Sequence, residues 1–463
     1  MDSSGTRTLT VSEIIDRQPL SRFQISTITL CGLVLLLDGF DTQCIGFLAP
    51  SISETLAIPL KNFGSVFSAG LIGLMIAAMA MGPVADRWGR KWPVVLSALT
   101  FAVFALLTAR AVSHEQLVIF RFLTGLGLGG AMPNVVALTS EYSPKRLQTV
   151  FVAMLFCGMP LGALVGGLAS SVMIPLWGWR SVFYLGGILP LLIALILIKA
   201  LPESVRFLTE RFRTEGGKNP REILRIMQRI SPGIGAADLD LSPRGAPDGA
   251  EANEGLPVRR LFTEDRAAGT ILLWIPFFMN LLILYFIVNW LPGLLRQSGQ
   301  PVTAGVIAVS LFSLGGIAGA LSEGRVMNSC GAYATLLAQF GISAVLIGSL
   351  AFLTRSFAIM MLVTFLLGLA VQGAQAGLNA LAANFYPTTV RSTGVGWALG
   401  IGRIGSIVGP AIGGMLLSMG WGPQRIFLAG MAPALCAAIA IWGTSRLRGQ
   451  ANVFAAELDP GRA

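Results

Sequence analysis

One short stretch of the chain reads Gly82-Pro83-Val84-Ala85-Asp86-Arg87-Trp88-Gly89-Arg90-Lys91. It is rich in charge and separates two long apolar runs, near 61–83 and 93–110. A helix needs about 20 mostly apolar residues to cross the hydrocarbon core of a bilayer, and both runs approach that length. A charged turn between two such runs is typical of a loop at a membrane surface.

The alternation of apolar runs and polar turns continues along the whole chain. Of the 463 residues, 54% are hydrophobic and 12% are charged, whereas soluble domains carry about 25% charged residues. We therefore predict an all-α membrane protein with twelve transmembrane helices in two pseudo-symmetric six-helix bundles. The predicted spans lie near 23–49, 61–83, 93–110, 116–139, 149–174, 180–200, 268–294, 303–326, 332–353, 357–384, 390–418 and 424–444.

A polar interval divides the spans into two sets of six. We expect an N-terminal tail (1–22), a first bundle (23–200), a central linker (201–267), a second bundle (268–445) and a C-terminal tail (446–463). The linker contains Gly216-Gly217 and Ser231-Pro232-Gly233, which favour a solvated segment, with one short amphipathic helix around Pro220–Ile230. Two bundles joined by a long linker suggest that the bundles move relative to each other.

The placement of Lys and Arg predicts the orientation in the membrane, because cytoplasmic loops carry an excess of both. With a cytoplasmic N-terminus, only a small share of these cations falls on the outer side. Both termini are therefore expected in the cytoplasm, and the protein in the inner (plasma) membrane. The net charge of +10 is explained by this topology, and we predict no nucleic-acid partner. The outer cations would be Lys61, Arg110, Arg180, Arg296, Arg355 and Arg425.

The loop at 82–91 resembles the signature loop of the major facilitator superfamily, G-x-x-x-D-R-x-G-R-K/R, which also follows the second span. Gly82 and Gly89 would permit close helix approach and a tight turn. Asp86 would pair with a basic neighbour or a helix N-terminus, and Arg87 and Arg90 suit a cytoplasmic anchor. The resemblance implies the major facilitator fold and transport by alternating access.

Two further stretches fit the same superfamily. The fourth span contains Arg121, followed at intervals of four by Gly125 and Gly129. This spacing resembles the R-x-x-x-G-x-x-x-G helix and gives a thin face for tight packing. Glu141, at the cytoplasmic end of that span, is the expected partner of Arg90 in a latch. The second bundle carries only a degenerate copy of the loop, with Asn328-Ser329 in place of Asp-Arg; Glu323 or Arg325 would replace it in part.

The first span contains two acidic residues, Asp38 and Asp41, in an otherwise apolar run. A charge at the bilayer centre costs about 2.5–3.5 kcal/mol on insertion scales, so such residues face a cavity or a partner. At positions i and i+3 they share one helix face. Their mutual repulsion would let one of them exchange a proton near neutral pH. The alternative is structural: one aspartate pairs with Arg121, or caps a helix break at Gly39.

Two arginines, Arg121 and Arg403, also lie inside predicted spans. Since arginine does not deprotonate in proteins, each needs a carboxylate, which either the protein or an anionic substrate supplies. The resemblance implies that spans 1, 4, 7 and 10 line a central cavity, which makes polar residues on spans 7 and 10 candidates for substrate binding. Taken singly, an amide in a spanning helix is more often part of a helix–helix hydrogen bond. These candidates are Asn280, Tyr285, Asn289, Trp290, Gln372, Gln375 and Asn379.

The tetrapeptide Asp38-Gly39-Phe40-Asp41 resembles the D-G-x-D signature of the aromatic acid/proton symporters. The stretches 279–292 and 386–410 also resemble that family, although the linker is longer than the family would suggest. The resemblance implies a proton-coupled symporter that imports a small aromatic carboxylate such as a hydroxybenzoate. The expected partners are that substrate, protons and the lipid bilayer, with the chain acting as a monomer.

Other functions stay open at this point. An exporter of the same fold, or a symporter of another metabolite or drug, remains the main alternative, although a drug exporter would favour an acidic cavity. A transporter-like sensor would be expected to carry a folded signalling appendage. We predict no enzyme activity, no cofactor and no metal, since the sequence has no nucleophile–base set, phosphate loop or metal cluster. His114, the single histidine, is expected to be incidental.

Overall fold

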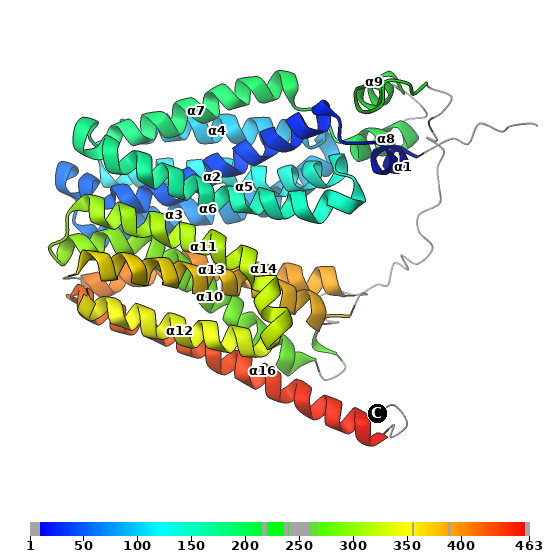
Figure 1. Cartoon of the computed structure of the whole chain (residues 1–463). Coiled ribbons are helices and arrows are strands. Elements are labelled where there is room, and N and C mark those ends of the chain that lie inside the picture. Colours follow the sequence, from blue (N-terminus) through cyan, green and yellow to red (C-terminus); the bar gives the residue numbers. More distant parts are fainter. Residues whose placement is uncertain are drawn as a thin grey trace, which may run out of the picture.

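The computed structural model is built of helices (Figure 1). It describes residues 10–214, 220–235, 239, 261–263, 266–353, 356–387 and 390–458. Arg355, together with parts of the two tails and of the predicted linker, lies outside the described residues.

Twelve helical segments are long and apolar enough to cross a membrane. The prediction of twelve spans in two sets of six is therefore confirmed. The last span is broken at Gly430 between α15 and α16. The segments are α2 (Arg22–Leu56), α3 (Phe63–Trp88), α4 (Lys91–Thr108), α5 (His114–Tyr142), α6 (Lys145–Trp177), α7 (Trp179–Ala200), α10 (Ala267–Gln297), α11 (Val302–Cys330), α12 (Ala332–Leu353), α13 (Phe357–Phe385), α14 (Arg391–Ser418), and α15 (Pro423–Ala429) with α16 (Met431–Leu458).

Local sequence signals set several of the helix ends. Ser21 begins α2 through a capping box with Gln24, in which each side chain bonds to the other residue's backbone N–H. At their C-terminal ends, α3 and α11 stop at Gly89 and Gly331, whose φ angles are +86° and +84°. Only glycine adopts such angles at little cost. The second spanning helix of each bundle thus ends at a glycine with a positive φ angle.

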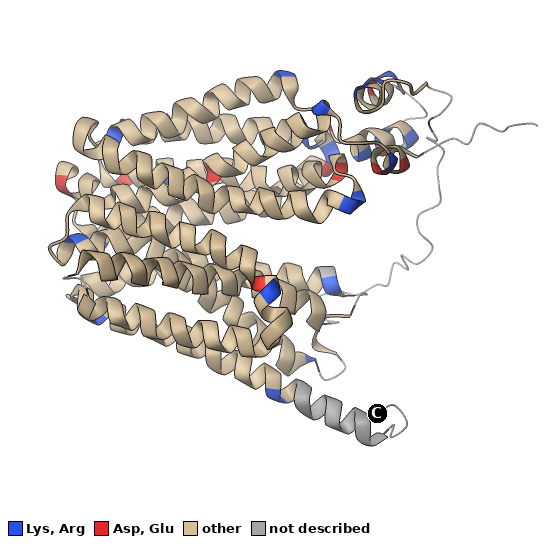
Figure 2. Cartoon of the chain, in the orientation of Figure 1, with Lys and Arg blue, Asp and Glu red and all other residues tan. Residues whose placement is uncertain are grey.

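Three short helices gather at one end of the first bundle, which we call the linker end (Figure 1). They are α1 (Val11–Arg17), α8 (Val205–Thr214) and α9 (Pro220–Ile230). Ile14, Val205 and Met227 share one buried core with the spans α2, α4, α5, α6 and α7. Figure 2 shows that charged residues concentrate at the two ends of the molecule, with Lys and Arg prominent at this one. The sequence predicted α9 alone; α1 and α8 are additions.

The two bundles meet at the end opposite the linker end. There a single buried core takes Phe47 and Phe67 from the first bundle and Phe286 and Trp290 from the second. Phe67 and Trp290 make an edge-on ring contact across the interface, with centroids 5.3 Å apart. At the linker end the bundles have separate cores, and Figure 1 shows them diverging there. The molecule is therefore closed at the opposite end.

Gly46 lies where α2 and α10 touch at the closed end. A Cβ atom at Gly46 would sit 2.5 Å from the carbonyl oxygen of Val288, and overpacking of this kind costs about 1–3 kcal/mol. We expect Gly46→Val to open this end, so that a cysteine replacing the buried Ser68 reacts about tenfold faster with an impermeant thiol reagent, by the tenfold-per-1.4 kcal/mol relation. Labelling would be measured after removal of the native cysteines.

Gly32 provides the matched control for this experiment. It lies on the same helix, and a Cβ atom there would meet nothing within 4 Å. Gly32→Val should therefore leave the labelling rate of the Ser68→Cys reporter unchanged. Equal rates in the two valine variants would contradict the assignment of Gly46 to the closed interface.

Candidate functional site

The acidic tetrapeptide of α2 lies at a crossing of helices. Gly39 faces α6, and a Cβ atom there would overlap the backbone of Met159. Phe40 packs against α6 and α7, where Gly166 and Gly186 leave room for its ring. Asp38 and Asp41 are both buried, with exposed fractions of 2% and 1%. The glycine and the phenylalanine therefore fix the helix against α6 and α7.

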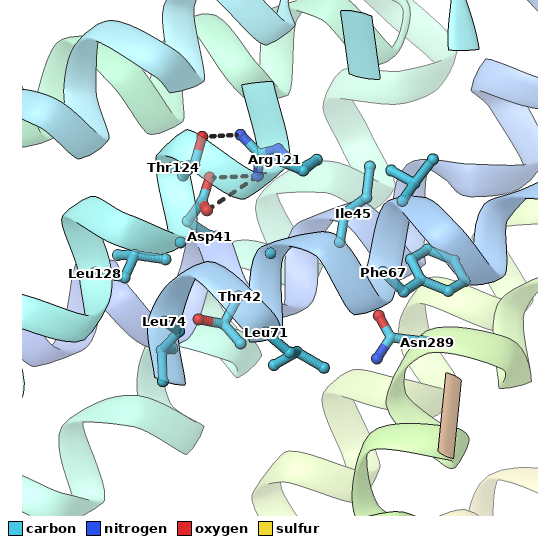
Figure 3. A pocket seen from close by; sticks show the side chains of 13 residues that line it. Asp41, Thr42, Ile45, Phe67, Leu71, Leu74, Arg121, Thr124, Leu128 and Asn289 are labelled. Atoms are coloured by element: carbon cyan, nitrogen blue, oxygen red, sulfur yellow. Dashed lines mark hydrogen bonds and ion pairs between the residues drawn. The ribbon is translucent and has the colours of Figure 1, made fainter. Parts of the chain in front are cut away.

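Asp41 forms an ion pair with Arg121 of α5 (Figure 3). The arginine Nη1 donates to both carboxylate oxygens, at 3.2 and 3.0 Å. Its Nη2 donates to the hydroxyls of Thr108 and Thr124, each at 3.0 Å, and its guanidinium lies 4.9 Å from the centre of the Phe183 ring. The charge of Arg121 is thus compensated within the first bundle. The sequence left open whether Arg121 pairs with a carboxylate of the protein or with an anionic substrate. In this structure it pairs with Asp41.

A small cavity lies beside this pair, at the junction of the two bundles. Its volume of about 30 Å³ is room for about two water molecules. It is lined by residues of α2, α3 and α5, and by Asn289 of α10 (Figure 3). The amide nitrogen of Asn289 donates to the carbonyl of Tyr285 at 2.7 Å. Asn289, one of the predicted substrate-binding candidates, therefore lines the same cavity as Asp41.

Asp38 has a different environment from Asp41. Its Oδ1 accepts a hydrogen bond from Thr42 at 3.0 Å, and it has no salt bridge to a cation among the described residues. Arg403 of α14 lies close enough to interact electrostatically with Asp38 and with the Tyr285 hydroxyl. Its Nη2 also contacts the sulfur of Met132 at 3.5 Å. Arg403 is half-buried, so Asp38, Tyr285 and Arg403 form a polar group between the two bundles.

The amides of α10 and α13 form a second polar group within the second bundle. Asn280 donates to the carbonyl of Val371 at 3.1 Å and to Gln375 at 2.9 Å, while its own carbonyl oxygen is buried without a partner among the described residues. Gln375 in turn lies 3.4 Å from the acceptor oxygen of Asn379. Asn280 and Gln375 thus form a contact between α10 and α13. In this contact the carbonyl oxygen of Asn280 is left without a donor among the described residues.

Gln372 and Trp290 make contacts between helices. The Gln372 amide donates to the carbonyl of Phe312 on α11 at 3.4 Å, and a Cβ atom at Gly316 would overlap it. The indole of Trp290 donates to the carbonyl of Pro410 at 2.9 Å. Both are helix–helix contacts, and for the Gln372 amide this matches the stated alternative to substrate binding. The other candidates split between the Asp38–Arg403 group, the Asp41 cavity and the Asn280–Gln375 group.

The predicted pair of Arg90 and Glu141 is present at the linker end. Both residues belong to the first bundle, and Glu141 also accepts a hydrogen bond from Ser204 at 2.6 Å. Gly89 makes the predicted tight turn. Gly82 and Asp86 differ from expectation: Gly82 has nothing within 4 Å of a Cβ position, and Asp86 is exposed, with no side-chain partner among the described residues. Arg87 is exposed as well, and its role as a cytoplasmic anchor stays a prediction. The loop is therefore packed at Gly89 and Arg90 and exposed at Gly82, Asp86 and Arg87.

Glu203 belongs to the same network and was not predicted. Its carboxylate accepts from the backbone N–H groups of Arg90 and Lys91, at 2.6 and 3.1 Å, and so caps the N-terminus of α4. Its backbone carbonyl accepts from the Tyr142 hydroxyl at 2.6 Å. The available signal was its position in Leu201-Pro202-Glu203-Ser204, directly after the sixth span, since an acidic residue beside a helix N-terminus is stabilised there.

The degenerate copy of the loop in the second bundle makes no latch among the described residues. Asn328, Ser329 and Arg325 are exposed. Glu323 is buried and accepts a hydrogen bond from Gln339. The expectation that Glu323 or Arg325 replaces the missing ion pair is therefore wrong, because the carboxylate faces an amide and the guanidinium faces away from the core.

The family model of the Major Facilitator Superfamily matches residues 31–354 and 274–457 of the chain. The chain belongs to the major facilitator superfamily. Among solved structures, a D-xylose-proton symporter is similar in fold, with a TM-score of 0.70 at 15% identity over 90% of this chain and 97% of that one. The predicted fold class and superfamily are thereby confirmed.

Two curated relatives narrow the family. The chain is 39% identical to the 4-hydroxybenzoate transporter PcaK of Pseudomonas putida, over 95% of this chain and 96% of that protein. It is 36% identical to a gallate transporter of Pseudomonas putida, over 96% and 97%. The predicted resemblance to transporters of aromatic acids is confirmed. This major facilitator protein is a multi-pass membrane transporter and not an enzyme.

Proposed function

We propose that this major facilitator protein imports a small aromatic carboxylate of the hydroxybenzoate type across the inner membrane, together with at least one proton. The relatives named for 4-hydroxybenzoate and gallate support the substrate class. One chain contains both bundles and the whole candidate site, so we propose a monomer. We also propose that both termini lie in the cytoplasm, which makes the linker end the cytoplasmic end and the described conformation inward-facing.

The observation that carries the proposal is the group formed by Asp38, Tyr285 and Arg403. The guanidinium of Arg403 belongs to the second bundle and interacts electrostatically with Asp38 of the first. Arg121 is occupied by Asp41, whereas Arg403 has no salt bridge among the described residues. Arg403 is therefore the arginine that binds the substrate carboxylate, which it can do through two parallel hydrogen bonds.

Competition for Arg403 couples the proton to the substrate. An ionised Asp38 attracts the guanidinium, and a proton on Asp38 releases it for the incoming carboxylate. The site then carries the same net charge whether it holds a proton and an anion or neither. Import of a monovalent anion into a negative-inside cell is opposed by the membrane potential, at about 2.3 kcal/mol per 100 mV. One accompanying proton removes that electrical cost.

The surroundings of Arg403 suit an aromatic ring. The sulfur of Met132 lies 3.5 Å from the guanidinium, and thioethers make favourable contacts with ring edges. The vacant carbonyl oxygen of Asn280 is an acceptor on the same helix as Tyr285, five residues earlier. We assign it to a ring hydroxyl, which needs an acceptor when it leaves water.

Uptake of labelled 4-hydroxybenzoate by cells expressing the chain tests the proposed function. We expect uptake against a concentration gradient, its abolition by a protonophore, and inhibition by unlabelled benzoates but not by aliphatic acids. Vector-only cells supply the background. Uptake that persists without a proton gradient would contradict symport, and inhibition by aliphatic acids alone would contradict the aromatic substrate.

Replacement of Arg403 by Lys should weaken substrate binding without removing the charge. Lysine cannot reproduce the bidentate contact, and a hydrogen bond to a charged group contributes about 1.5–3 kcal/mol. We expect the half-saturating concentration to rise about tenfold or more, by the tenfold-per-1.4 kcal/mol relation. Arg425→Lys, at an exposed position, is the matched control. An unchanged half-saturating concentration for Arg403→Lys would place the carboxylate elsewhere.

A further inference from the structure

Glu323 is a buried carboxyl group that the proposed transport cycle does not use. It lies on α11 in the linker half of the second bundle, and only 3% of it is exposed. Two glycines of α13 make room for it. A Cβ atom at Gly377 would lie 2.5 Å from its Oε1, and one at Gly373 would lie 3.1 Å from its Oε2. The carboxyl group thus occupies a space formed by α11, α12 and α13.

The hydrogen bonding of this carboxyl group is incomplete. Gln339 of α12 donates its amide nitrogen to Glu323 Oε2 at 2.6 Å. Glu323 Oε1 and Gln339 Oε1 are both buried without a partner among the described residues. Both atoms are acceptors if the carboxylate is ionised, so neither can satisfy the other. An unsatisfied acceptor in a buried site is costly, and here there are two.

Among the residues that the structure describes, no cation forms an ion pair with Glu323. On the helices that enclose Glu323, the other charged or titratable groups are Arg325 and Cys330 of α11, both exposed, and Tyr333 of α12. The part of α13 that the structure describes carries none. A buried carboxylate without a positive partner takes up a proton instead of remaining charged. The site therefore lacks the positive partner that an ionised glutamate requires.

We propose that Glu323 binds a proton in this conformation and forms an acid–amide pair with Gln339. The carboxylic O–H donates to the amide carbonyl, and the amide N–H donates to the acid carbonyl. One proton thus satisfies both vacant acceptors. If the Gln339 amide is turned the other way, its carbonyl faces Glu323 Oε2 at 2.6 Å, and a proton is required between the two oxygens as well.

This proton site is separate from Asp38 and Asp41 and lies in the other bundle. It joins α11 to α12 by a neutral contact, at the end where the first bundle uses the ionic contact between Arg90 and Glu141. Loss of the proton at alkaline pH would leave a charge with one hydrogen bond and would loosen α12 from α11. The second bundle thereby acquires a pH-sensitive contact that does not depend on the substrate.

Infrared spectra of the purified full-length protein test the proposal directly. A protonated carboxyl group has a carbonyl stretching band distinct from that of a carboxylate. In neutral buffer we expect this band in the difference between the parent protein and Glu323→Gln, and its loss at alkaline pH. Glu115→Gln, which removes an exposed carboxyl group, is the control and should change only carboxylate absorption. A difference spectrum for Glu323→Gln with carboxylate absorption alone would overturn the proposal.

Two further variants keep the test informative if Glu323→Gln folds poorly. Gln339→Leu removes the amide but keeps the acid, and should shift the carbonyl band to the frequency of a carboxyl group without that hydrogen bond. The exchange Glu323→Gln with Gln339→Glu rebuilds the same pair in reverse and should restore the parental band and melting temperature. An unshifted band in Gln339→Leu would show that the acid–amide pair does not exist. None of these readouts depends on uptake, so their failure is distinct from failure of the proposed symport.

Discussion

Arg121→Leu is expected to abolish uptake and to lower the free energy of unfolding by about 3–5 kcal/mol, the usual effect of removing one partner from a buried ion pair. The replacement leaves Asp41 buried beside two threonine hydroxyls that have lost their guanidinium partner. Asp41 must then keep an uncompensated charge or take up a proton, and either choice destabilises the contact of α2 with α5. Thermal unfolding of the purified protein and uptake in cells measure the two effects.

A paired substitution separates stability from transport in this experiment. Replacing both partners, as Asp41→Asn with Arg121→Leu, removes the uncompensated charge and should recover most of the lost melting temperature, because two neutral groups cost less to bury than one charge. Uptake should stay absent, since the cavity loses both charged groups that line it, Asp41 and Arg121. Arg425→Leu is the control at an exposed position. Full uptake in the double variant would show that the pair is only structural.

The twelve spans could be predicted because the bilayer imposes a minimum apolar length on each helix. The ends of the helices could not, since polar residues continue a helix beyond the hydrocarbon. The first span was expected at 23–49, whereas α2 runs from Arg22 to Leu56 and includes Ser51 and Glu54. Helix α8 was missed for a related reason: it contains as many charged residues as apolar ones, so its segment resembles a linker.

The sequence predicted which residues belong to the candidate site, but not which aspartate pairs with which arginine. Helix periodicity places Asp38 and Asp41 on one face, and cannot say which of them reaches Arg121, because that depends on how α2 and α5 cross. The close packing at Gly39 sets the rotation of α2 and brings Asp41 to the arginine. Glu203 was missed because it lies 113 residues from Arg90, and its position after the sixth span does not show which helix N-terminus it caps.

Asp38→Asn should abolish accumulation of substrate while leaving exchange of substrate across the membrane. Asparagine imitates the protonated acid, so Arg403 stays available and the loaded transporter still changes conformation. It cannot release a proton, so the empty return step loses its coupling to the gradient. We expect uphill uptake to fall to the background of vector-only cells. Counterflow of labelled 4-hydroxybenzoate into vesicles preloaded with unlabelled substrate should persist near the parental rate.

The neighbouring aspartate is the matched control for this uncoupling. Asp41→Asn makes the same chemical change one helix turn away, but it leaves the buried Arg121 without its carboxylate. We therefore expect Asp41→Asn to lose both uptake and counterflow, together with melting temperature, since an unpaired buried charge disturbs every conformation. The difference between two isosteric changes on one helix face then identifies the proton carrier. If Asp38→Asn also loses counterflow, Asp38 serves in substrate binding or folding, and the competition for Arg403 is not the coupling step.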